Sequence, residues 1–483
     1  MSMLRRFASL LALLLAVMMI FAACGPEEKI SSVADDTEEV SSEETIDETE
    51  ATESEKETSS KKTSSKKEEK DNGVYNGFSQ SAEAGGSMYA NAPKKEVHVL
   101  MWREYHKSEQ QLITQYEKLT GVKVKTTVSD QNNYPTKLVT MVSGDDAPDV
   151  VMFQSNNFPG LVTKSLQPLK SKYFQLESDC WNKQYMDQYK IYDNYFGVAM
   201  PSSWSCEDCT YVTYYSPAVL KNCGIAEDPY ELYLNGGWNW DKQNEIIRAV
   251  KAKGLTGISL QSNDMFMLSA GVDFATYDGK TYTNELATKQ TGNSLLTQAW
   301  MKVSELNSED CLTGWNLTNV QQGTVGLFTA ISYGLYNEGN WFTNNFAKDL
   351  KAVPVAGPTG GTAYTPVRPK VWGVPKKAKN PEGAAYFLRY FLDVSEFNQD
   401  ATFHNDNFKE VYKKITDSKA PKKVMHGSGV CDYVNSGTYS KICNDLTATI
   451  PANIISQLDS KAKVATAGIN RANKDLARYK PKS

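Results

Sequence analysis

The cysteines are the side chains of this sequence most suited to redox or metal chemistry, and seven of the eight lie beyond residue 100. Cys206 and Cys209 form a Cys-x-x-Cys pair, which could be redox-active or half of a zinc site. Because no second pair exists and no His is close in sequence, a local disulfide or two free thiols is favoured. We predict no metal site and no cofactor. An odd number in an exported chain implies at least one free thiol or an intermolecular bond, and the pairing stays open among Cys180, Cys206, Cys209, Cys223, Cys311, Cys431 and Cys443.

Motifs of common catalytic machinery are missing from the sequence. The Gly-rich stretch 357–361 lacks the Gly-Lys-Ser/Thr of a P-loop, and there is no Gly-x-Ser-x-Gly or His-Glu-x-x-His. Glycoside hydrolysis needs two carboxylates that flank one bond. Glu104 and Asp264 could be imagined in that role, although their spacing gives it no support. A secreted glycan-active enzyme is therefore the weaker alternative, and we predict no catalytic residue.

The N-terminus combines a short basic region with an apolar stretch. Arg5 and Arg6 precede residues 10–21, which are apolar throughout. A dozen apolar residues are too few to cross a bilayer, which takes roughly 20, so the pattern indicates a signal peptide over residues 1–23. The sequence FAACG at 21–25 resembles the bacterial lipobox, in which the Cys is acylated, and Cys24 is the predicted lipid anchor. Phe stands where Leu is usual, and the alternative is a Cys that happens to lie near an ordinary cleavage site.

Residues 24–95 have the composition of a disordered tether. Between residues 25 and 95 there are 18 acidic and 9 basic side chains, and Ser, Thr, Glu and Lys dominate. Such a segment cannot bury enough apolar area to offset the entropy of ordering it. With leader and tether subtracted from the net charge of −5, residues 96–483 carry about +2, which leaves no strong basic field for nucleic acid. The lipid anchor is the membrane contact that we predict.

The rest of the chain is too long for one hydrophobic core and long enough for two lobes. The apolar run 97–102 predicts a buried strand, the spacing over 112–119 predicts a helix, and residues 122–128 predict a second strand. A helix over 137–142 and a strand over 149–153 follow. This alternation predicts parallel strands with right-handed crossovers, hence an α/β lobe whose ligand lies beyond the carboxyl ends of the strands.

Short motifs along the chain are similar, in order, to those of the family 1 extracellular solute-binding proteins. Residues 116–124, YEKLTGVKV, and 143–151, SGDDAPDVV, resemble two successive motifs of this family. Residues 380–387, NPEGAAYF, resemble a later one. A single piece is weak, but the ordered series covers nearly all of residues 96–400, whereas the C-terminal part matches only loosely. Further likenesses lie at 160–169, 195–198, 214–216, 237–241, 322–327 and 353–358.

The resemblance implies a two-lobe α/β fold of the periplasmic-binding-protein type (type II, the maltose-binding type), with a hinge and a cleft between the lobes. In such proteins the chain crosses between the lobes more than once. We expect lobe 1 to contain residues 96–203 and 350–425. Lobe 2 is expected to contain residues 204–349, with closing helices from 426–483. The expected hinges are residues 201–203 and 353–354.

A saccharide presents apolar faces and hydroxyl groups, so its site needs flat rings beside planar donors and acceptors. Loops after the first and third expected strands carry such side chains, and the resemblance implies that they line the cleft. It assigns hydrogen bonding to Arg103, Glu104, Asn156 and Asn157. It also places a cleft loop at Asp264 and Phe266 and an aromatic platform at Tyr333 and Tyr336, where Trp is frequent in the family. The remaining stacking candidates are Trp204 and Trp372.

Several of these rings have a competing interpretation. Phe266 and Tyr336 are of a kind found more often in core packing, and Trp372 fits a core strand as well as a cleft. Trp315 and Trp341 receive no place from the sequence. Binding roles and packing roles therefore stay open for these aromatic residues.

The resemblance implies a lipid-anchored, non-enzymatic binding protein on the extracellular side of the cell membrane, in a Gram-positive bacterium. It would act as a monomer that captures a small solute and delivers it to the permease subunits of an ABC importer, powered by their ATPase. An oligosaccharide is favoured as the solute because aromatic residues are plentiful and no charge pattern marks a polyamine, phosphate or metal site. A surface glycan sensor that does not transport is the first alternative, and the secreted enzyme is the second.

Overall fold

The computed structural model describes residue 89 and residues 91–105, 107–130, 133–178, 181–199, 210–288, 290–336, 341–392, 403–417 and 419–481. All of these belong to one unit of the chain, Glu68–Ser483. Several predictions fall outside the described residues: the signal peptide, Cys24, most of the tether, the hinge at 201–203, Trp204, Cys180, Cys206 and Cys209.

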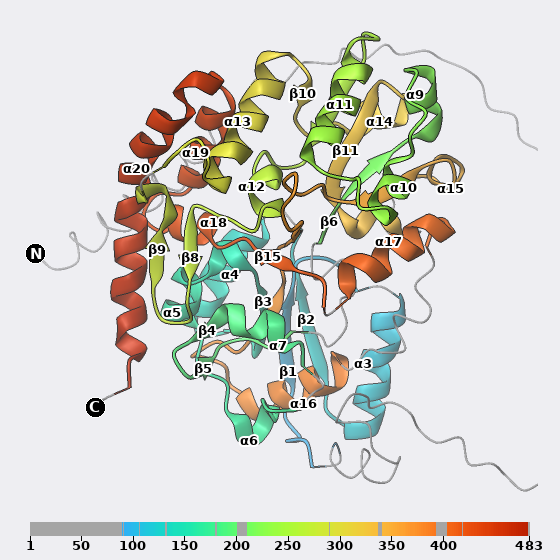
Figure 1. The fold of residues 1–483 in the computed structure, drawn as a ribbon. Coiled ribbons are helices and arrows are strands. Elements are labelled where there is room, and N and C mark those ends of the chain that lie inside the picture. Colours follow the sequence, from blue (N-terminus) through green and yellow to red (C-terminus); the bar gives the residue numbers. More distant parts are fainter. Residues whose placement is uncertain are drawn as a thin grey trace, which may run out of the picture. The chain divides into compact units, whose positions relative to one another are not determined.

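The first sheet has the strand order β14-β3-β1-β2, and β3, β1 and β2 are labelled in Figure 1. β1 (Val97–Met101), β2 (Val124–Val128) and β3 (Val150–Phe153) pair in parallel, and α3 (Lys107–Thr120) and α4 (Tyr134–Ser143) connect them. β1 and β3 are buried throughout, as expected for parallel strands covered on both faces. The predicted alternation of strands and helices over residues 97–153 is confirmed. At the edge, β14 (Val371–Gly373) pairs with β3 in the antiparallel sense.

The second sheet has the order β10-β7-β11-β6-β12. β10 (Leu312–Thr313) and β11 (Val325–Ile331) both pair in parallel with β7 (Thr256–Leu260). β6 (Tyr211–Tyr215) pairs with β11 in the antiparallel sense, and β12 (Lys351–Pro354) pairs with β6 in the antiparallel sense. α11 (Trp240–Lys251) packs against β7 and β11. The carboxyl ends of β7 and β11 therefore meet at one edge, where loops that could bind a ligand begin.

The chain passes from the second sheet to the first between β12 and β14. β12 pairs with β6, whereas β14 pairs with β3, and α17 (Asp406–Thr416) returns to pack against β12. We expected residues 350–425 in lobe 1. β12 and α17 instead lie with the second sheet, because β6 supplies the edge to which β12 hydrogen-bonds. Val353 and Pro354, expected at a hinge, are part of β12, and the other lobe boundaries stay predictions.

The C-terminal helices pack against α13 (Leu295–Ser308) and against the short segments that follow β3. α18 (Gly427–Cys431), α19 (Thr438–Thr447) and α20 (Ile454–Leu476) contact one another, and α19 and α20 also contact α13. The shorter elements are α5 (Gly160–Ser165), α6 (Ser171–Phe174), α7 (Lys183–Met186), β4 (Lys190–Ile191), β5 (Asn194–Tyr195), α9 (Pro217–Asn222), α10 (Pro229–Leu234), α12 (Met265–Ser269), β8 (Ala275–Tyr277), β9 (Tyr282–Asn284), α14 (Leu317–Gln321), α15 (Asn344–Ala347), β13 (Thr365–Val367), β15 (Lys422–Val424) and α16 (Pro381–Phe391), which packs on α3.

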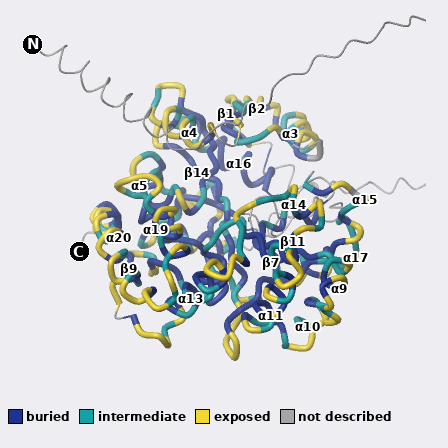
Figure 2. Tube along the Cα trace, turned by 90° about the horizontal axis from the view of Figure 1, so that it is seen from above, coloured by how far each residue is buried: buried dark blue, intermediate teal, exposed yellow. Residues whose placement is uncertain are grey.

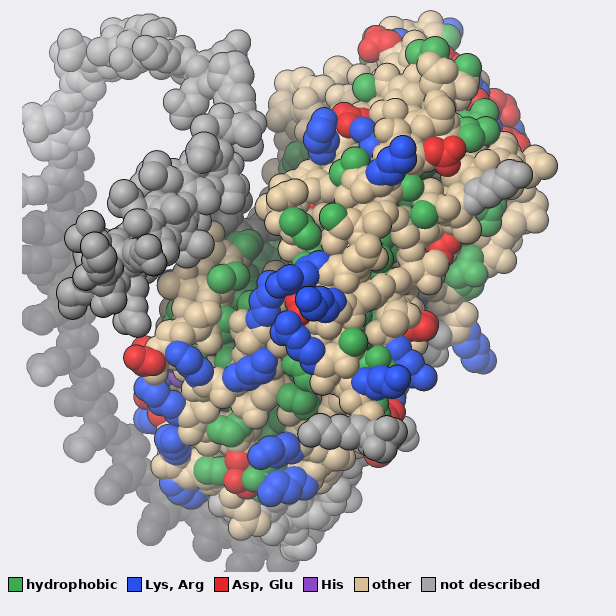
Figure 3. All heavy atoms as spheres, turned by 90° about the vertical axis from the view of Figure 1, so that its left-hand side faces the viewer, with side chains coloured by type: hydrophobic (Ala, Val, Ile, Leu, Met, Phe, Trp, Pro, Cys, Tyr) green, Lys and Arg blue, Asp and Glu red, His purple; other side chains and the backbone are tan. Residues whose placement is uncertain are grey.

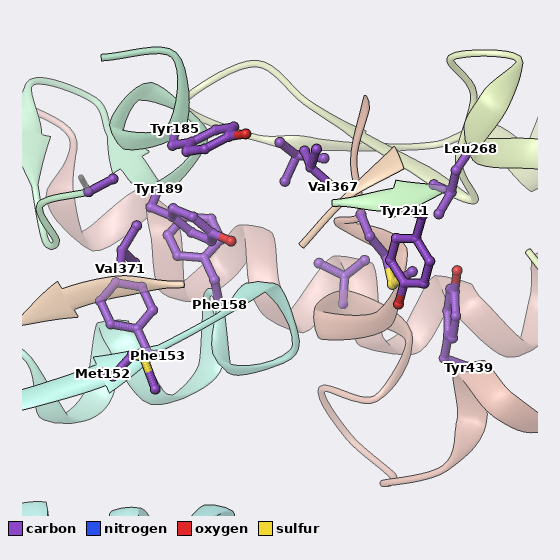
Figure 4. Packing of buried hydrophobic residues seen from close by; sticks show 14 of the residues in the cluster. Met152, Phe153, Phe158, Tyr185, Tyr189, Tyr211, Leu268, Val367, Val371 and Tyr439 are labelled. Carbon is purple, nitrogen blue, oxygen red and sulfur yellow. The ribbon is translucent and has the colours of Figure 1, made fainter. Parts of the chain in front are cut away.

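Buried residues fill the interior around both sheets, with exposed residues along the outer helices and loops (Figure 2). Figure 4 shows Phe153, Phe158 and Tyr189 packed close together. The ring centroids of Phe153 and Phe158 lie 5.5 and 5.4 Å from that of Tyr189, in edge-to-face contacts that stabilise buried aromatic clusters. Cys223, Cys311, Cys431 and Cys443 are buried free thiols.

A buried junction around His426 joins segments that are far apart in sequence. The carboxylate of Asp273 accepts hydrogen bonds from the backbone N–H groups of His426 and Gly427, both at 2.8 Å. The imidazole Nε2 of His426 lies 3.1 Å from Oε1 of Gln188. Burial, with a smaller effect of Lys423, lowers the pKa of His426 to about 3, and burial raises the pKa of Asp273 to about 6. We call these contacts the His426 junction.

On the face drawn in Figure 3, Lys and Arg side chains are more frequent than Asp and Glu, and the two signs are interspersed. This mixture agrees with the small positive charge of residues 96–483 and forms no continuous field of one sign. Within the part of the chain that the structure describes, no helix has the length and apolarity needed to cross a membrane.

Candidate functional site

A cavity of about 550 Å³ is lined from both sheets. Its size is in the range of pockets that hold small molecules. We define the first wall as the lining residues from the first sheet and its loops: Trp102, Arg103, Tyr134, Pro135, Met152, Phe153, Gln154, Asn156, Asn157, Arg368 and Lys370. The second wall comprises those from the second sheet and its loops: Tyr211, Gln261, Trp315, Ile331, Tyr333 and Trp341.

The loop after β1 carries a fixed cation. The guanidinium of Arg103 donates two hydrogen bonds to the carboxylate of Glu109, at 2.7 and 2.9 Å, and a third to the backbone oxygen of Glu104. Glu109 stands in the first turn of α3, and its side chain is only 4 % exposed. A bidentate pair of this kind fixes both position and orientation of the guanidinium. Arg103 therefore presents a held charge to the cavity.

The ring of Trp102 supports a second cation of the first wall. Nζ of Lys370 lies 4.0 Å from the centroid of this ring, and Cζ of Arg103 lies 5.5 Å from it. Both distances are within the range of a cation–π attraction. Trp102 thus positions charge at this wall in addition to contributing apolar surface.

Amide side chains lie at the ends of β3 and β7. Asn156 and Asn157 belong to the 3-10 turn Ser155–Asn157, and Oδ1 of Asn157 accepts a hydrogen bond from the backbone N–H of Gln154 at 3.1 Å. On the second wall, Oε1 of Gln261 accepts from the backbone N–H of Ile331 at 2.9 Å. These bonds hold the amides at the cavity surface, where planar donor and acceptor groups can meet hydroxyls.

Three rings form a cluster on the second wall. The ring centroid of Trp341 lies 5.6 Å from that of Tyr333 and 4.8 Å from that of Trp315, both in edge-to-face geometry. Tyr333 belongs to the 3-10 turn Ser332–Leu335 directly after β11, and Trp315 also contacts Phe328 of β11. Trp315 is 42 % exposed, so its ring is accessible to a ligand. We call Trp315, Tyr333 and Trp341 the ring cluster.

Four of the predicted site residues line the cavity: Arg103, Asn156, Asn157 and Tyr333. Glu104 is exposed and is not among the lining residues. Trp204 lies outside the described residues. Ligand binding by the four lining residues stays a prediction.

Four other predicted residues are placed in the core instead. Asp264 is fully buried and accepts a hydrogen bond from the Tyr439 hydroxyl at 2.5 Å. Phe266 packs against Trp240, with ring centroids 5.9 Å apart. Neither Glu104 nor Asp264 is among the residues that line the cavity.

Tyr336 and Trp372 are buried by partners from distant parts of the sequence. The ring of Tyr336 lies 4.8 Å from that of Phe403, and Trp372 in β14 lies 5.8 Å from Phe391. The backbone N–H of Trp372 also donates to Val198 at 2.9 Å. Both residues therefore have the packing role that was the alternative to binding.

Several lining residues were not predicted from the sequence. Trp315 and Trp341 lie in loops without periodicity, and Arg368 and Lys370 lie between two short strands. Tyr134 reaches the cavity from the start of α4, where its hydroxyl donates to the backbone oxygen of Met152 at 2.8 Å. Trp341 lies only eight residues after Tyr333, and this closeness in sequence to the predicted aromatic platform is a signal from which its place in the cavity could have been inferred.

The charge of the lining is one-sided. Arg103, Arg368 and Lys370 are cationic, and none of the described residues that line the cavity is a carboxylate. The structure also places no group of three His, Cys, Asp or Glu side chains, among the residues it describes, where they could hold a metal ion. The cavity therefore offers rings, amides and cations to a ligand.

Comparisons with known proteins give one family and a set of similar folds. The family described as "Bacterial extracellular solute-binding protein" matches residues 103–394. No curated protein sequence matches the chain.

The similar solved structures are two-lobed binding proteins. One is the galacto-N-biose/lacto-N-biose I-binding protein of an ABC transporter from Bifidobacterium longum, in complex with lacto-N-biose (TM-score 0.59, 13 % identity, 78 % of this chain and 97 % of that chain). A second is a Staphylococcus aureus extracellular solute-binding protein in complex with maltose (TM-score 0.56, 14 % identity, 79 % and 99 %). A third is the cyclic alpha-maltosyl-1,6-maltose binding protein of Arthrobacter globiformis (TM-score 0.55, 14 % identity, 78 % and 99 %). These likenesses confirm the predicted two-lobe α/β fold of the maltose-binding type.

Proposed function

Because the chain belongs to the bacterial extracellular solute-binding proteins, we propose that it captures an oligosaccharide in the cavity between its two sheets. The observation that carries this proposal is the ring cluster facing the amides and cations of the first wall. A saccharide needs an apolar platform for its CH faces and planar polar groups for its hydroxyls, and the cavity supplies both. The family described by the matching model consists of solute-binding proteins.

Binding is expected to act through the relative position of the two lobes. A ligand that contacts both walls at once stabilises the conformation in which those walls are close, by the difference in its contacts between the open and closed forms. The closed form would then dock, as a monomer, on the permease subunits of an ABC importer and release the solute to them. Deletion of the gene should therefore abolish uptake of the solute, whereas a sensor would leave uptake intact.

Cys24 is proposed as the lipid anchor that keeps the protein on the outer side of the membrane. The support is the apolar stretch that precedes it and the small residues beside it. Metabolic labelling with a palmitate analogue tests this. The full chain should incorporate the label and Cys24→Ala should not, and equal labelling of both would refute the anchor.

The decisive experiment for binding is a screen of the purified full chain against an oligosaccharide array, followed by calorimetry on the best sugar. Saturable binding that Trp341→Ala weakens would support the proposal. Absence of binding to every saccharide class would refute it.

A further inference from the structure

The two walls of the cavity differ in charge. The first wall carries Arg103, Arg368 and Lys370, whereas the described residues of the second wall carry no charge. Neutral sugars can be held by uncharged donors and acceptors, whereas cations around one cavity raise the cost of removing water from it. This arrangement becomes favourable when the bound molecule brings negative charge of its own.

The three cations are held in different ways. Both terminal nitrogens of Arg103 bond to the carboxylate of Glu109, so this residue is the most fixed. Nη2 of Arg368 lies 3.2 Å from the sulfur of Met425. Lys370 is held over the Trp102 ring as a point charge on a flexible stem. Each cation takes part in further interactions, so what matters here is its place on the wall.

Trp102 is also less suited to stacking than the rings of the second wall. The Lys370 ammonium lies 4.0 Å from its centroid, where a sugar ring would have to lie on that face. The ring cluster is therefore the apolar side of the cavity, and the loop between β13 and β14, with Arg368 and Lys370, is the charged side.

We propose that the bound oligosaccharide is anionic, with carboxylate or sulfate groups that meet Lys370 and Arg368 while its ring faces lie against Trp341 and Tyr333. This inference rests on the proposed function and specifies its substrate class. Arg103, neutralised by Glu109, serves in this arrangement as a hydrogen-bond donor and not as the principal anion site.

The test compares three sets of probes on the purified full chain: galacturonate trisaccharide, its methyl ester together with maltotriose, and a sulfated disaccharide. Calorimetry should show binding of the uronate or the sulfated probe, and the arm that binds identifies the anion. For the uronate arm, esterification should weaken binding at least tenfold. High salt should weaken the binding of the anionic probe and leave any binding of a neutral probe unchanged.

The matched variants are Lys370→Met and Arg368→Met, which keep an unbranched apolar stem and remove the charged end of the side chain. Each should weaken the anionic probe at least tenfold, and Lys370→Arg should restore most of the loss. The control is Lys123→Met, whose side chain lies just before β2, is 77 % exposed and is not among the residues that line the cavity; it should change affinity less than twofold.

The outcomes separate the two proposals. Binding of neutral saccharides alone, or anionic binding that neither variant weakens, would overturn the anionic ligand and leave oligosaccharide capture standing. Failure to bind either anionic probe would overturn the anionic ligand, and only absence of binding across the full oligosaccharide array would refute oligosaccharide capture as well. Lys370 contacts the Trp102 ring, so the thermal unfolding of Lys370→Met is compared with that of Lys370→Arg. Equal melting temperatures show that a loss of affinity is due to the lost charge.

Discussion

The first and second walls of the cavity offer a ligand different kinds of side chain. The first wall uses cations and amides, each fixed by a contact behind it: Arg103 by Glu109, Lys370 by Trp102, and Asn157 by the backbone of Gln154. The second wall uses rings that hold one another edge to face. Directional groups fix which hydroxyl or anion is recognised, whereas stacking tolerates many sugars. We therefore expect selectivity to come from the first wall and general affinity from the second.

The largest effect is expected from removing the support beneath the first wall. Asp149 is 3 % exposed, and its carboxylate accepts hydrogen bonds from the backbone N–H groups of His98 and Asn380, at 2.9 and 2.6 Å. In Asp149→Ala both N–H groups are buried without an acceptor, so the free energy of unfolding should fall by about 3 kcal/mol in urea titrations. The exposed neighbour provides the control: Asp145→Ala should cost less than about 0.5 kcal/mol. Equal stability of the two variants would disprove this role.

The next effect concerns the His426 junction and depends on pH. Because its folded-state pKa of about 3 lies below the usual 6.5, the folded state binds the proton less well than the unfolded chain. This contribution to stability is present above pH 6.5 and is lost as pH falls toward 3. Between pH 7 and 5 the unfolding free energy of the native sequence should drop about 2 kcal/mol more than that of His426→Gln.

A second residue of the His426 junction, Asp273, should change stability with pH in the opposite direction. The pKa of Asp273 is raised to about 6, so its contribution to stability is present below pH 3.8 and is lost as pH rises through 6. Asp273→Asn removes that contribution, and its unfolding free energy should fall about 1 kcal/mol more than the native value between pH 7 and 5. Parallel pH profiles for both variants and the native sequence would contradict the assignment.

A separate effect, on binding and not on folding, is expected at the second wall. Trp341→Ala removes the central ring of the ring cluster and should weaken oligosaccharide binding by about 1.5 kcal/mol, roughly tenfold, in calorimetry. If stacking is the reason, Trp341→Phe should recover most of the affinity. The loss of affinity should be the same for charged and neutral sugars, because stacking on a ring face does not depend on the charge of the sugar. A loss confined to one class of sugar would contradict the assignment of selectivity to the first wall.

The smallest effect separates two neighbouring tyrosines. Tyr333→Ala should weaken binding by about 1 kcal/mol, because this ring lines the cavity. Tyr336→Ala should leave the affinity of the folded protein unchanged and lower its stability, because that ring packs on Phe403. Calorimetry and urea unfolding on the pair measure both quantities. A reversed outcome would show that the two rings exchange roles in solution.

The sequence predicted best what depends on neighbours along the chain. The apolar runs of β1 and β3 are local signals, so the first parallel sheet and the loop carrying Arg103, Asn156 and Asn157 could be anticipated. The resemblance to a family supplied the second lobe.

Contacts between distant segments could not be predicted in this way. Tyr333 and Tyr336 are of the same type and three residues apart, and what separates them is a partner, Phe403, from another part of the chain. Asp264 is polar and follows β7, yet Tyr439 from α19 buries it. Trp315 and Trp341 lie in loops, where no periodicity indicates which way a ring faces.

The late strand β14 has a consequence for how this protein is made. β3 hydrogen-bonds to β14 along one edge, yet β14 is translated only after the whole of β6 to β12. As long as β14 is not in place, the edge of β3 is an apolar strand edge without its partner, the kind of surface on which chains associate wrongly. No single cut in the chain separates the two sheets, so fragments ending before residue 371 should depend on chaperones and aggregate without them.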